Sequence, residues 1–191
     1  AYIKSKHSKN LFMLPASQTD EKDSVNPGEM LELLDKIKQD FHFILVDSPA
    51  GIEQGFKNAC AGADEAIVVA TPEVSSIRDA DRVIGLLAAQ GLDTSVIINR
   101  VDKDMVRKGD MLSPQDVIAI LGVDQIGLIQ RDDGIVVSAN TGEPVIFNPK
   151  NRAGQAFMDV AERLLGNEVP IEDLTQNDGI FARLGRRLRA A

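Results

Sequence analysis

Short apolar runs rich in β-branched residues alternate along the chain with longer stretches of helical period. Each run is apolar at consecutive positions, as strands buried on both faces of a parallel sheet are. The runs cover residues 11–14, 43–46, 66–70, 95–98 and 125–129. This alternation of strand and helix predicts a doubly wound α/β fold, mostly parallel, with right-handed crossovers and helices on both faces of the sheet.

The segments between these runs carry signals for the starts of helices. Asn26, followed by a proline, is expected to cap a helix over 30–38. Ser113 and Asp116 form the pattern of a capping box before the apolar residues 117–121. Local sequence therefore predicts where at least two helices begin.

The last part of the chain changes character. A helix of the core type is expected over 153–165, ending at Gly166, a residue suited to a left-handed cap. Residues 167–178 are polar and acidic without an apolar period, which is typical of a linker. We therefore expect one α/β domain over 1–166, a linker over 167–178 and a separate helix over 179–191.

Composition limits the class of protein and the cellular location that we expect. The 191 residues include 43% hydrophobic ones, enough for one sizeable core. The net charge of −8 argues against a general nucleic-acid binder, because phosphate binding needs a basic surface. A single cysteine and the lack of an apolar run of membrane-spanning length favour a cytoplasmic protein.

The run over 43–46 is followed by the chain's first candidate for chemistry. Asp47 is expected at the carboxyl end of a buried strand, where open α/β sheets bind ligands. A carboxylate there can hold Mg²⁺ through a water, and the following Ser48-Pro49-Ala50-Gly51 turn can bring N–H groups near a phosphate. The alternative is an aspartate that only caps the next turn.

Several motifs resemble one family. The segment from Asp47 to Glu53 is similar to the Walker B and second switch segment of the MinD family, within the deviant Walker A ATPases. Further matches are Leu14 to Thr19, Pro72 to Arg82, Asn99-Arg100, residues 107–113, residues 142–145 and the basic C-terminal helix. Two departures are Gln130, where the family usually has a proline, and Asp20-Glu21 at a commonly basic position.

The resemblance implies a P-loop NTPase-like fold and an ATPase that helps place the bacterial division septum. ATP and Mg²⁺ are the implied cofactors, with Asp47 as the catalytic and Mg²⁺-binding carboxylate, acting through a water. Nucleotide contacts are implied for Ser48, Pro49, Ala50, Gly51, Asn99 and Arg100. Asn99 would contact adenine; from the residues alone it could equally cap a local turn. The family forms a homodimer when ATP is bound.

A helix beginning near Ser75 is implied to contact partner proteins. By resemblance, Ser75, Arg78, Asp79 and Asp81 lie on the surface that engages MinC-like and MinE-like proteins. Charges three residues apart share one helix face, so the residues alone are also explained by an ordinary solvated surface.

The P-loop itself does not occur in the sequence. ATP binding in this family needs a Gly-x-x-x-x-Gly-Lys-[Ser/Thr] run, and no such run is present. We therefore expect this chain alone to be inactive. The expected explanation is a piece of a longer protein whose P-loop precedes Ala1; the alternative is a natural protein that has lost catalysis.

The C-terminal residues form an amphipathic pattern. Placed at about 100° per residue, their large apolar side chains share one narrow face. The apolar residues are Ile180, Phe181, Leu184 and Leu188, and the opposing cations are Arg183, Arg186, Arg187 and Arg189. Such a helix is expected to lie in an anionic membrane surface, the cytoplasmic face of the inner membrane by resemblance. The alternative is a helix docked on its own domain.

Two other functions compete with the ATPase. A DNA-partition ATPase of the ParA type would need a basic surface on the body of the protein, whereas the positive charge here is concentrated in the tail. A non-enzymatic adaptor would keep only the partner surface and the membrane helix. A P-loop in the coding sequence upstream would decide for an ATPase.

Overall fold

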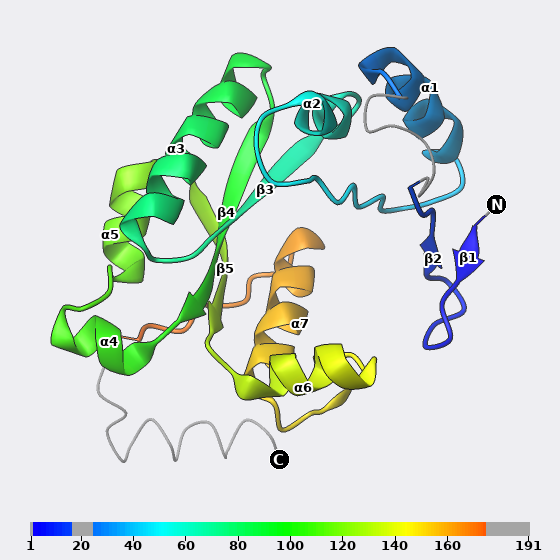
Figure 1. The fold of residues 1–191 in the computed structure, drawn as a ribbon. Coiled ribbons are helices and arrows are strands. Elements are labelled where there is room, and N and C mark those ends of the chain that lie inside the picture. The colour runs from blue at the N-terminus through cyan, green and yellow to red at the C-terminus, as the bar shows by residue number, and fades with distance from the viewer. Residues whose placement is uncertain (1, 17–24, 175–191) are drawn as a thin grey trace. The chain divides into compact units, whose positions relative to one another are not determined.

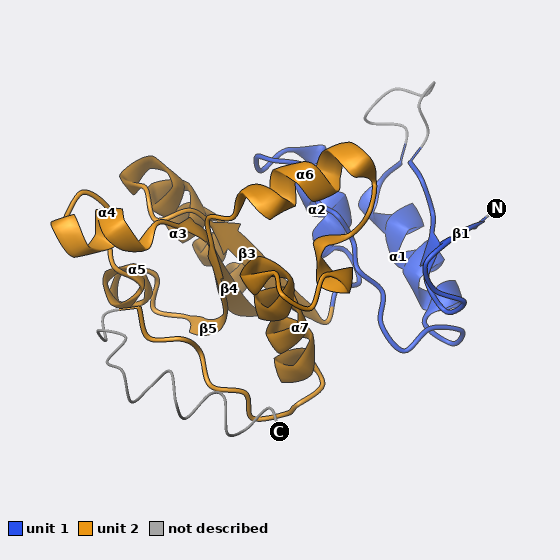
Figure 2. Cartoon of the chain, turned by 90° about the horizontal axis from the view of Figure 1, so that it is seen from below, with its two compact units in different colours: residues 1–63 blue, residues 64–191 orange. Residues whose placement is uncertain are grey.

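The computed structural model describes residues 2–16 and 25–174, and the chain divides into two compact units, residues 1–63 and 64–191 (Figure 2). Unit 1 contains the strands β1 (Ile3–Lys4) and β2 (Phe12–Met13) and the helices α1 (Pro27–Ile37) and α2 (Gln54–Cys60). β1 and β2 pair antiparallel. Tyr2, Phe12 and Phe41 pack edge to face beside this hairpin.

The predicted helix starts are confirmed. Asn26 caps α1 in a capping box with Glu29, and the helix begins at Pro27. In unit 2, Ser113 caps α5 (Pro114–Leu121) in a second capping box. Both boxes satisfy N–H groups that have no partner within the helix, which is why these short local patterns suffice to fix the start.

Unit 2 contains the parallel sheet. Its strands are β3 (Glu65–Ala70), β4 (Asp93–Val101) and β5 (Asp124–Gln130), parallel and in the order β3-β4-β5. The helix α3 (Val74–Ala89) connects the first two strands, and α4 (Lys103–Lys108) and α5 connect the second and third. After β5 come α6 (Asp133–Thr141), η1 (Val145–Phe147) and α7 (Arg152–Leu164).

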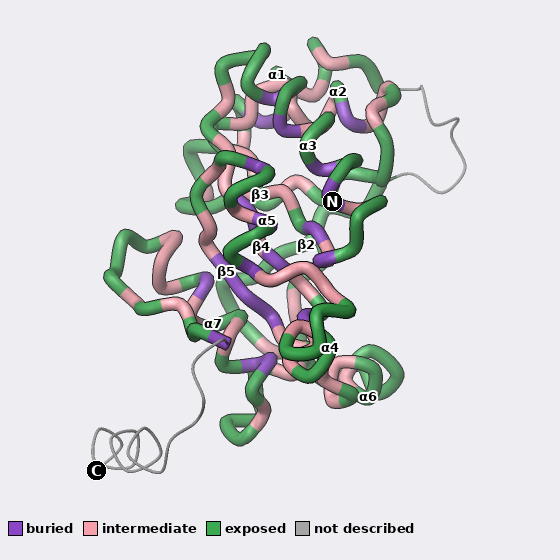
Figure 3. Tube along the Cα trace, turned by 90° about the vertical axis from the view of Figure 1, so that its left-hand side faces the viewer, coloured by how far each residue is buried: buried purple, intermediate pink, exposed green. Residues whose placement is uncertain are grey.

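Helices cover both faces of this sheet (Figure 1). α3 and α5 pack on one face, where Ile77, Ile84, Ile98 and Val117 belong to the main core. The core runs along the sheet and the inner sides of these helices (Figure 3). α7 covers the other face, and Gly127 of β5 allows its close approach: a Cβ there would lie 2.5 Å from Cγ2 of Val160.

Two predicted strands differ from the expectation. Residues 43–46 form no strand, and Phe43 and Leu45 are 60% and 85% exposed rather than buried. A strand apolar on both faces needs hydrogen-bonded neighbours, and no described residue pairs with this segment. The run at 11–14 gives only the two-residue β2 in an antiparallel hairpin. The described parallel sheet therefore contains three of the five expected strands.

The outer edge of the sheet is formed by β3, which pairs only with β4 among the described strands. Its side chains alternate between the covered and the open face. Val69 is 59% exposed and Ile67 is also exposed, while Ala70 is buried.

The segment after α7 also differs from the expected linker. Ile171 packs against the main core and Leu174 belongs to it, with 1% of its surface exposed. Residues up to Leu174 are thus part of the packed unit, because their few apolar side chains are spaced to reach the core. The tail residues Ile180, Phe181, Arg183, Leu184, Arg186, Arg187 and Leu188 lie outside the described residues.

Candidate functional site

The carboxyl end of β4 places the first pair of expected nucleotide-binding residues. Asn99 is half-buried, and its Oδ1 accepts a hydrogen bond from the backbone N–H of Arg100 at 2.8 Å. Arg100 has a φ of 59°, the only positive φ of a non-glycine residue in the described chain. This conformation costs about 1 kcal/mol or more in a residue with a Cβ and is concentrated at functional sites.

A hollow of about 700 Å³ lies at the same edge of the sheet. It is lined by the starts of α3 and α5, by α4 and by the loop between α4 and α5, together with Arg100 and Arg131. Neither guanidinium is hydrogen-bonded or ion-paired to a described residue, so both can meet an anionic or aromatic group. Arg131 was not among the predicted site residues, although its position directly after β5 is the same signal that pointed to Asn99.

Two acidic residues of this hollow already have structural roles. Asp102 caps α4 by accepting hydrogen bonds from the N–H groups of Asp104 and Met105. Asp116 accepts from the Ser113 hydroxyl at 2.6 Å and from the Ser113 N–H at 3.2 Å. These hydrogen bonds lower the pKa of Asp116, the hydroxyl contributing most. Neither carboxylate is therefore a good candidate for acid–base chemistry.

The Asp47 segment belongs to unit 1. Asp47, Ser48, Pro49, Ala50 and Gly51 are all exposed. The chain turns there as expected: Gly51 has a φ of 98°, and the Pro49 ring lies so close to Gly55 that a Cβ at Gly55 would meet it at 2.4 Å. The turn brings the segment directly onto the start of α2, and the roles assigned to its five residues stay predictions.

The metal-binding side chains among the described residues fit Mg²⁺ bound together with a nucleotide better than Mg²⁺ held by the protein alone. Among the described residues, no group of three or more His, Cys, Asp or Glu side chains could hold a metal ion. Mg²⁺ is commonly held by one or two carboxylates together with substrate phosphates and waters. The exposed Asp47 carboxylate can supply one such ligand.

α3 gathers the four residues of the expected partner surface. Ser75, Arg78, Asp79 and Asp81 are all exposed on it. The opposite side of the helix is buried through Ile77, Ala80, Ile84 and Leu87. The helix is thus held by its apolar side, and its charged side is available for contact.

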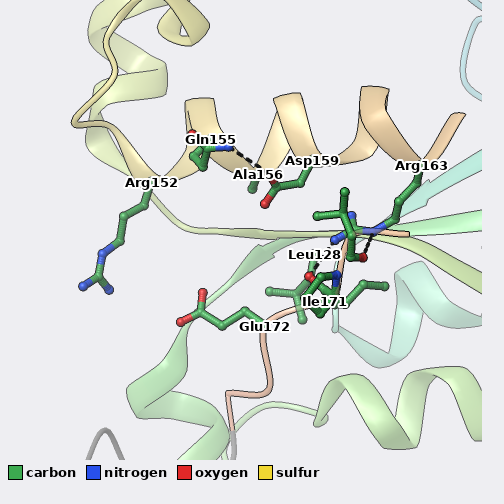
Figure 4. Close-up of a pocket in the computed structure, with 10 residues that line it drawn as sticks. Leu128, Arg152, Gln155, Ala156, Asp159, Arg163, Ile171 and Glu172 are labelled. Atoms are coloured by element: carbon green, nitrogen blue, oxygen red, sulfur yellow. Dashed lines mark hydrogen bonds between the residues drawn. The ribbon is translucent and has the colours of Figure 1, made fainter. Parts of the chain in front are cut away.

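A second hollow, of about 620 Å³, lies between α7 and residues 169–172 (Figure 4). Leu128, Ala156 and Ile171 are among its apolar lining residues, and Asp159 accepts a hydrogen bond from Gln155 in its wall. Arg163 in the same wall donates to three backbone carbonyls. The role of Arg163 could not be predicted from the sequence, because its partners are main-chain groups that leave no signal there.

None of the helices in the described part of the chain combines the length and the apolar character needed to cross a bilayer.

Comparison with curated proteins gives a consistent group of relatives, although no family profile matches the chain. The septum site-determining protein MinD of Bacillus subtilis is 40% identical over 188 residues, which are 96% of this chain and 70% of that protein. The MinD of Synechocystis is 43% identical over 191 residues, covering 98% of this chain and 72% of that protein. The MinD of Escherichia coli K12 is 42% identical over 195 aligned residues, covering 96% and 72%.

Solved structures agree with the curated relatives. The MinD cell division protein of Aquifex aeolicus superposes with a TM-score of 0.83 at 42% identity, covering 90% of this chain and 71% of that one. A MinC:MinD complex from the same organism gives 0.83 at 42% identity, covering 91% and 70%. MinD of Pyrococcus horikoshii complexed with Mg-ADP gives 0.66 at 28% identity, covering 73% and 56%.

Proposed function

The chain belongs to the MinD family of septum site-determining proteins, and from this membership we propose that it is the greater part of an ATPase that helps place the division septum. The observation that carries the proposal is identity of 40–43% to three such proteins over at least 96% of the chain. The doubly wound fold, with helices on both faces of a parallel sheet, supports it.

The proposed chemistry is hydrolysis of ATP bound with Mg²⁺. Asp47 would hold the metal through a water, the turn from Ser48 to Gly51 would lie near the terminal phosphate, and Asn99 with Arg100 would hold the base. Mg²⁺ supplies charge neutralisation for phosphoryl transfer when bound. A relative complexed with Mg-ADP supports the cofactor. Because the sequence contains no P-loop, we propose turnover only for a protein in which that motif is also present.

The proposed partners follow from the exposed side of α3 and from the tail. A MinC:MinD complex among the similar structures supports a MinC-like partner. We propose that this partner binds at Ser75, Arg78, Asp79 and Asp81. A MinE-like partner would use the same surface. In the proposed cycle, ATP drives homodimerisation and hydrolysis reverses it. In the ATP-bound dimer, two tails bind the cytoplasmic face of the inner membrane together, which can strengthen attachment by about 10² to 10⁴.

The partner surface can be tested in an extended protein, in which a P-loop segment from a relative precedes residue 1. With ATP present, Asp79→Arg should weaken MinC binding at least tenfold, equivalent to about 1.4 kcal/mol, because it reverses a charge on the exposed side of α3. Asp124→Arg is the matched control: it makes the same change at an exposed residue at the start of β5.

Binding of MinC to the immobilised variants measures both affinities, and ATP turnover checks that the site is intact. Equal loss of MinC binding in both variants would mean that net charge decides it, and the assignment of α3 as the partner surface would fail.

A further inference from the structure

The segment over residues 169–174, here called the strap, connects α7 with the predicted tail. α7 ends beside the first half of β5, where Arg163 reaches the carbonyl of Ile126. From there the strap follows β5 to its carboxyl end, where Gln130 donates a hydrogen bond to Glu172 at 2.8 Å. The strap therefore carries the chain from the first half of β5 to its carboxyl end (Figure 1).

Arg163 holds the first part of the strap. Its Nε donates to the carbonyl of Val169 at 2.8 Å, and its two terminal nitrogens donate to Ile126 at 2.9 Å and Pro170 at 3.0 Å. One planar guanidinium thus joins the strap to β5 through main-chain groups of both. Lysine could not reproduce this, because its ammonium lacks the rigid fork geometry that these divergent bonds require.

The far end of the strap is fixed by packing. Leu174 is almost completely buried among the residues of the main core, and Ile171 packs beside them. Gln130 is also the residue that departs from the proline usual in the family, and a proline there could not make the side-chain hydrogen bond to Glu172. The strap is held at its start, middle and end.

We propose that the strap is a fixed guide that sets the point from which the tail leaves the body, and that Arg163 is its positioning residue. The point lies at the carboxyl edge of the sheet, the edge that carries Asn99 and Arg100. The position of the strap follows from its own contacts. Its effect on membrane binding rests on the proposed function of the tail.

The consequence concerns how many residues lie between the end of the strap and the predicted tail helix. Four residues separate Leu174 from position 179, where the predicted helix begins, whereas twelve would separate Gly166 from it if the strap were loose. A flexible tether spans about 5–6 Å times the square root of its number of residues. Four residues would therefore span roughly 11 Å, and twelve residues roughly 19 Å. Effective concentration falls with about the −3/2 power of tether length, so threefold lengthening lowers the avidity of a dimer about fivefold.

The experiment measures where the strap ends, in the 191-residue chain and without lipid. Cys60→Ser removes the natural thiol, and Ala88→Cys with Thr175→Cys places spin labels on the exposed side of α3 and directly after the strap. The parent should give one narrow distance distribution. Arg163→Gln should broaden it and speed hydrogen exchange over 167–174.

Arg152→Gln is the matched control, because Arg152 lies on the same helix and lines the same hollow but makes no hydrogen bond with the strap among the described residues. It should leave the narrow distribution unchanged. Leu174→Asn releases the strap from the core without touching α7, and should also broaden the distribution if Arg163→Gln fails to fold.

A broad distribution in the parent overturns the proposal, as does a narrow one in both Arg163→Gln and Leu174→Asn. Vesicle binding of the same variants separates this inference from the proposed function. A single Arg163→Gln chain should bind anionic vesicles as the parent does, and only the dimer of the extended protein should lose about fivefold. If no chain binds vesicles, the membrane role fails while the spin-label result still decides the guide.

Discussion

At the residue scale, Arg100 shows the clearest local sign of a functional demand. Its left-handed backbone costs about 1 kcal/mol or more, yet the position holds an arginine rather than a glycine. Arg100 lines the same hollow as Arg131, and its guanidinium has no bonded partner among the described residues. Its position near the carboxyl end of β4 could be predicted from the sequence, but the backbone conformation could not, because arginine carries no propensity for it.

Asp47 is the residue whose role is most directly testable. In the extended protein, Asp47→Asn should keep the fold, since the side chain is exposed, and lower ATP turnover at least tenfold, about 1.4 kcal/mol of transition-state stabilisation. Asp40→Asn is the control, an equivalent change at another exposed position of the same unit. Steady-state turnover at varied Mg²⁺ measures the effect. Parental turnover in the Asp47 variant would leave this carboxylate with a capping role only.

Asp116 should make stability depend on acid pH. Its folded-state pKa is lowered by the hydrogen bonds from Ser113, so the native state favours the charged form. The stabilisation is present above the unfolded-state pKa, about 3.9, and is lost as the pH falls through the lowered folded value. As the pH falls through this range, the melting temperature of the parent should fall toward that of Ser113→Ala. The melting temperature of Ser113→Ala should depend less on pH. Parallel curves would contradict the role of this pair.

At the scale of elements, sequence patterns predicted a helix or strand correctly where the groups that stabilise it lie nearby in the sequence. Both capping boxes and the three strands of unit 2 could be predicted, because a cap bonds within its own turn and each strand has its crossover helices beside it in sequence. Residues 43–46 failed as a strand because pairing depends on a neighbour that no local pattern supplies. The strap was missed for the same reason: Arg163 bonds carbonyls, and Leu174 is a single apolar residue in a polar segment.

The packing of α7 on β5 depends on Gly127. Gly127→Ala would place a Cβ 2.5 Å from Val160 and should lower the free energy of unfolding by about 1–3 kcal/mol. Adding Val160→Ala should recover part of this loss, because it removes the methyl group that clashes. Gly85→Ala in α3 is the control, with no atom near its Cβ, and should stabilise by up to about 1 kcal/mol. Urea denaturation measures all four proteins; equal effects at both glycines would refute close packing.

At the scale of the whole molecule, the fold class could be predicted from the sequence, but the division of the chain into units could not. Alternating strands and helices indicated a doubly wound sheet, and the similar structures confirm it. The division into two units did not follow from the sequence, since it depends on which distant segments pack together. The chain's charge is also unevenly spread: it totals −8, while the last thirteen residues carry four arginine side chains and no acid.

This distribution predicts that the tail carries the affinity for membranes. Phe181→Glu places a charge on the apolar face and should abolish binding to anionic vesicles even at low salt. Arg183→Gln with Arg186→Gln leaves that face intact and should weaken binding by about 2 kcal/mol, with less sensitivity to salt. Co-sedimentation across a salt series compares these with a chain ending at Asp178. If the shortened chain sediments with vesicles as the parent does, another surface binds the lipid.

One edge of the sheet in unit 2 bears on the sedimentation measurement. Among the described strands β3 pairs only with β4, and its Val69 and Ile67 side chains are exposed, so its other edge is a template on which another polypeptide can add. The 191-residue chain should therefore self-associate as its concentration rises, and such aggregates would pellet without any lipid. Light scattering against concentration locates this threshold, below which sedimentation reports on vesicles alone.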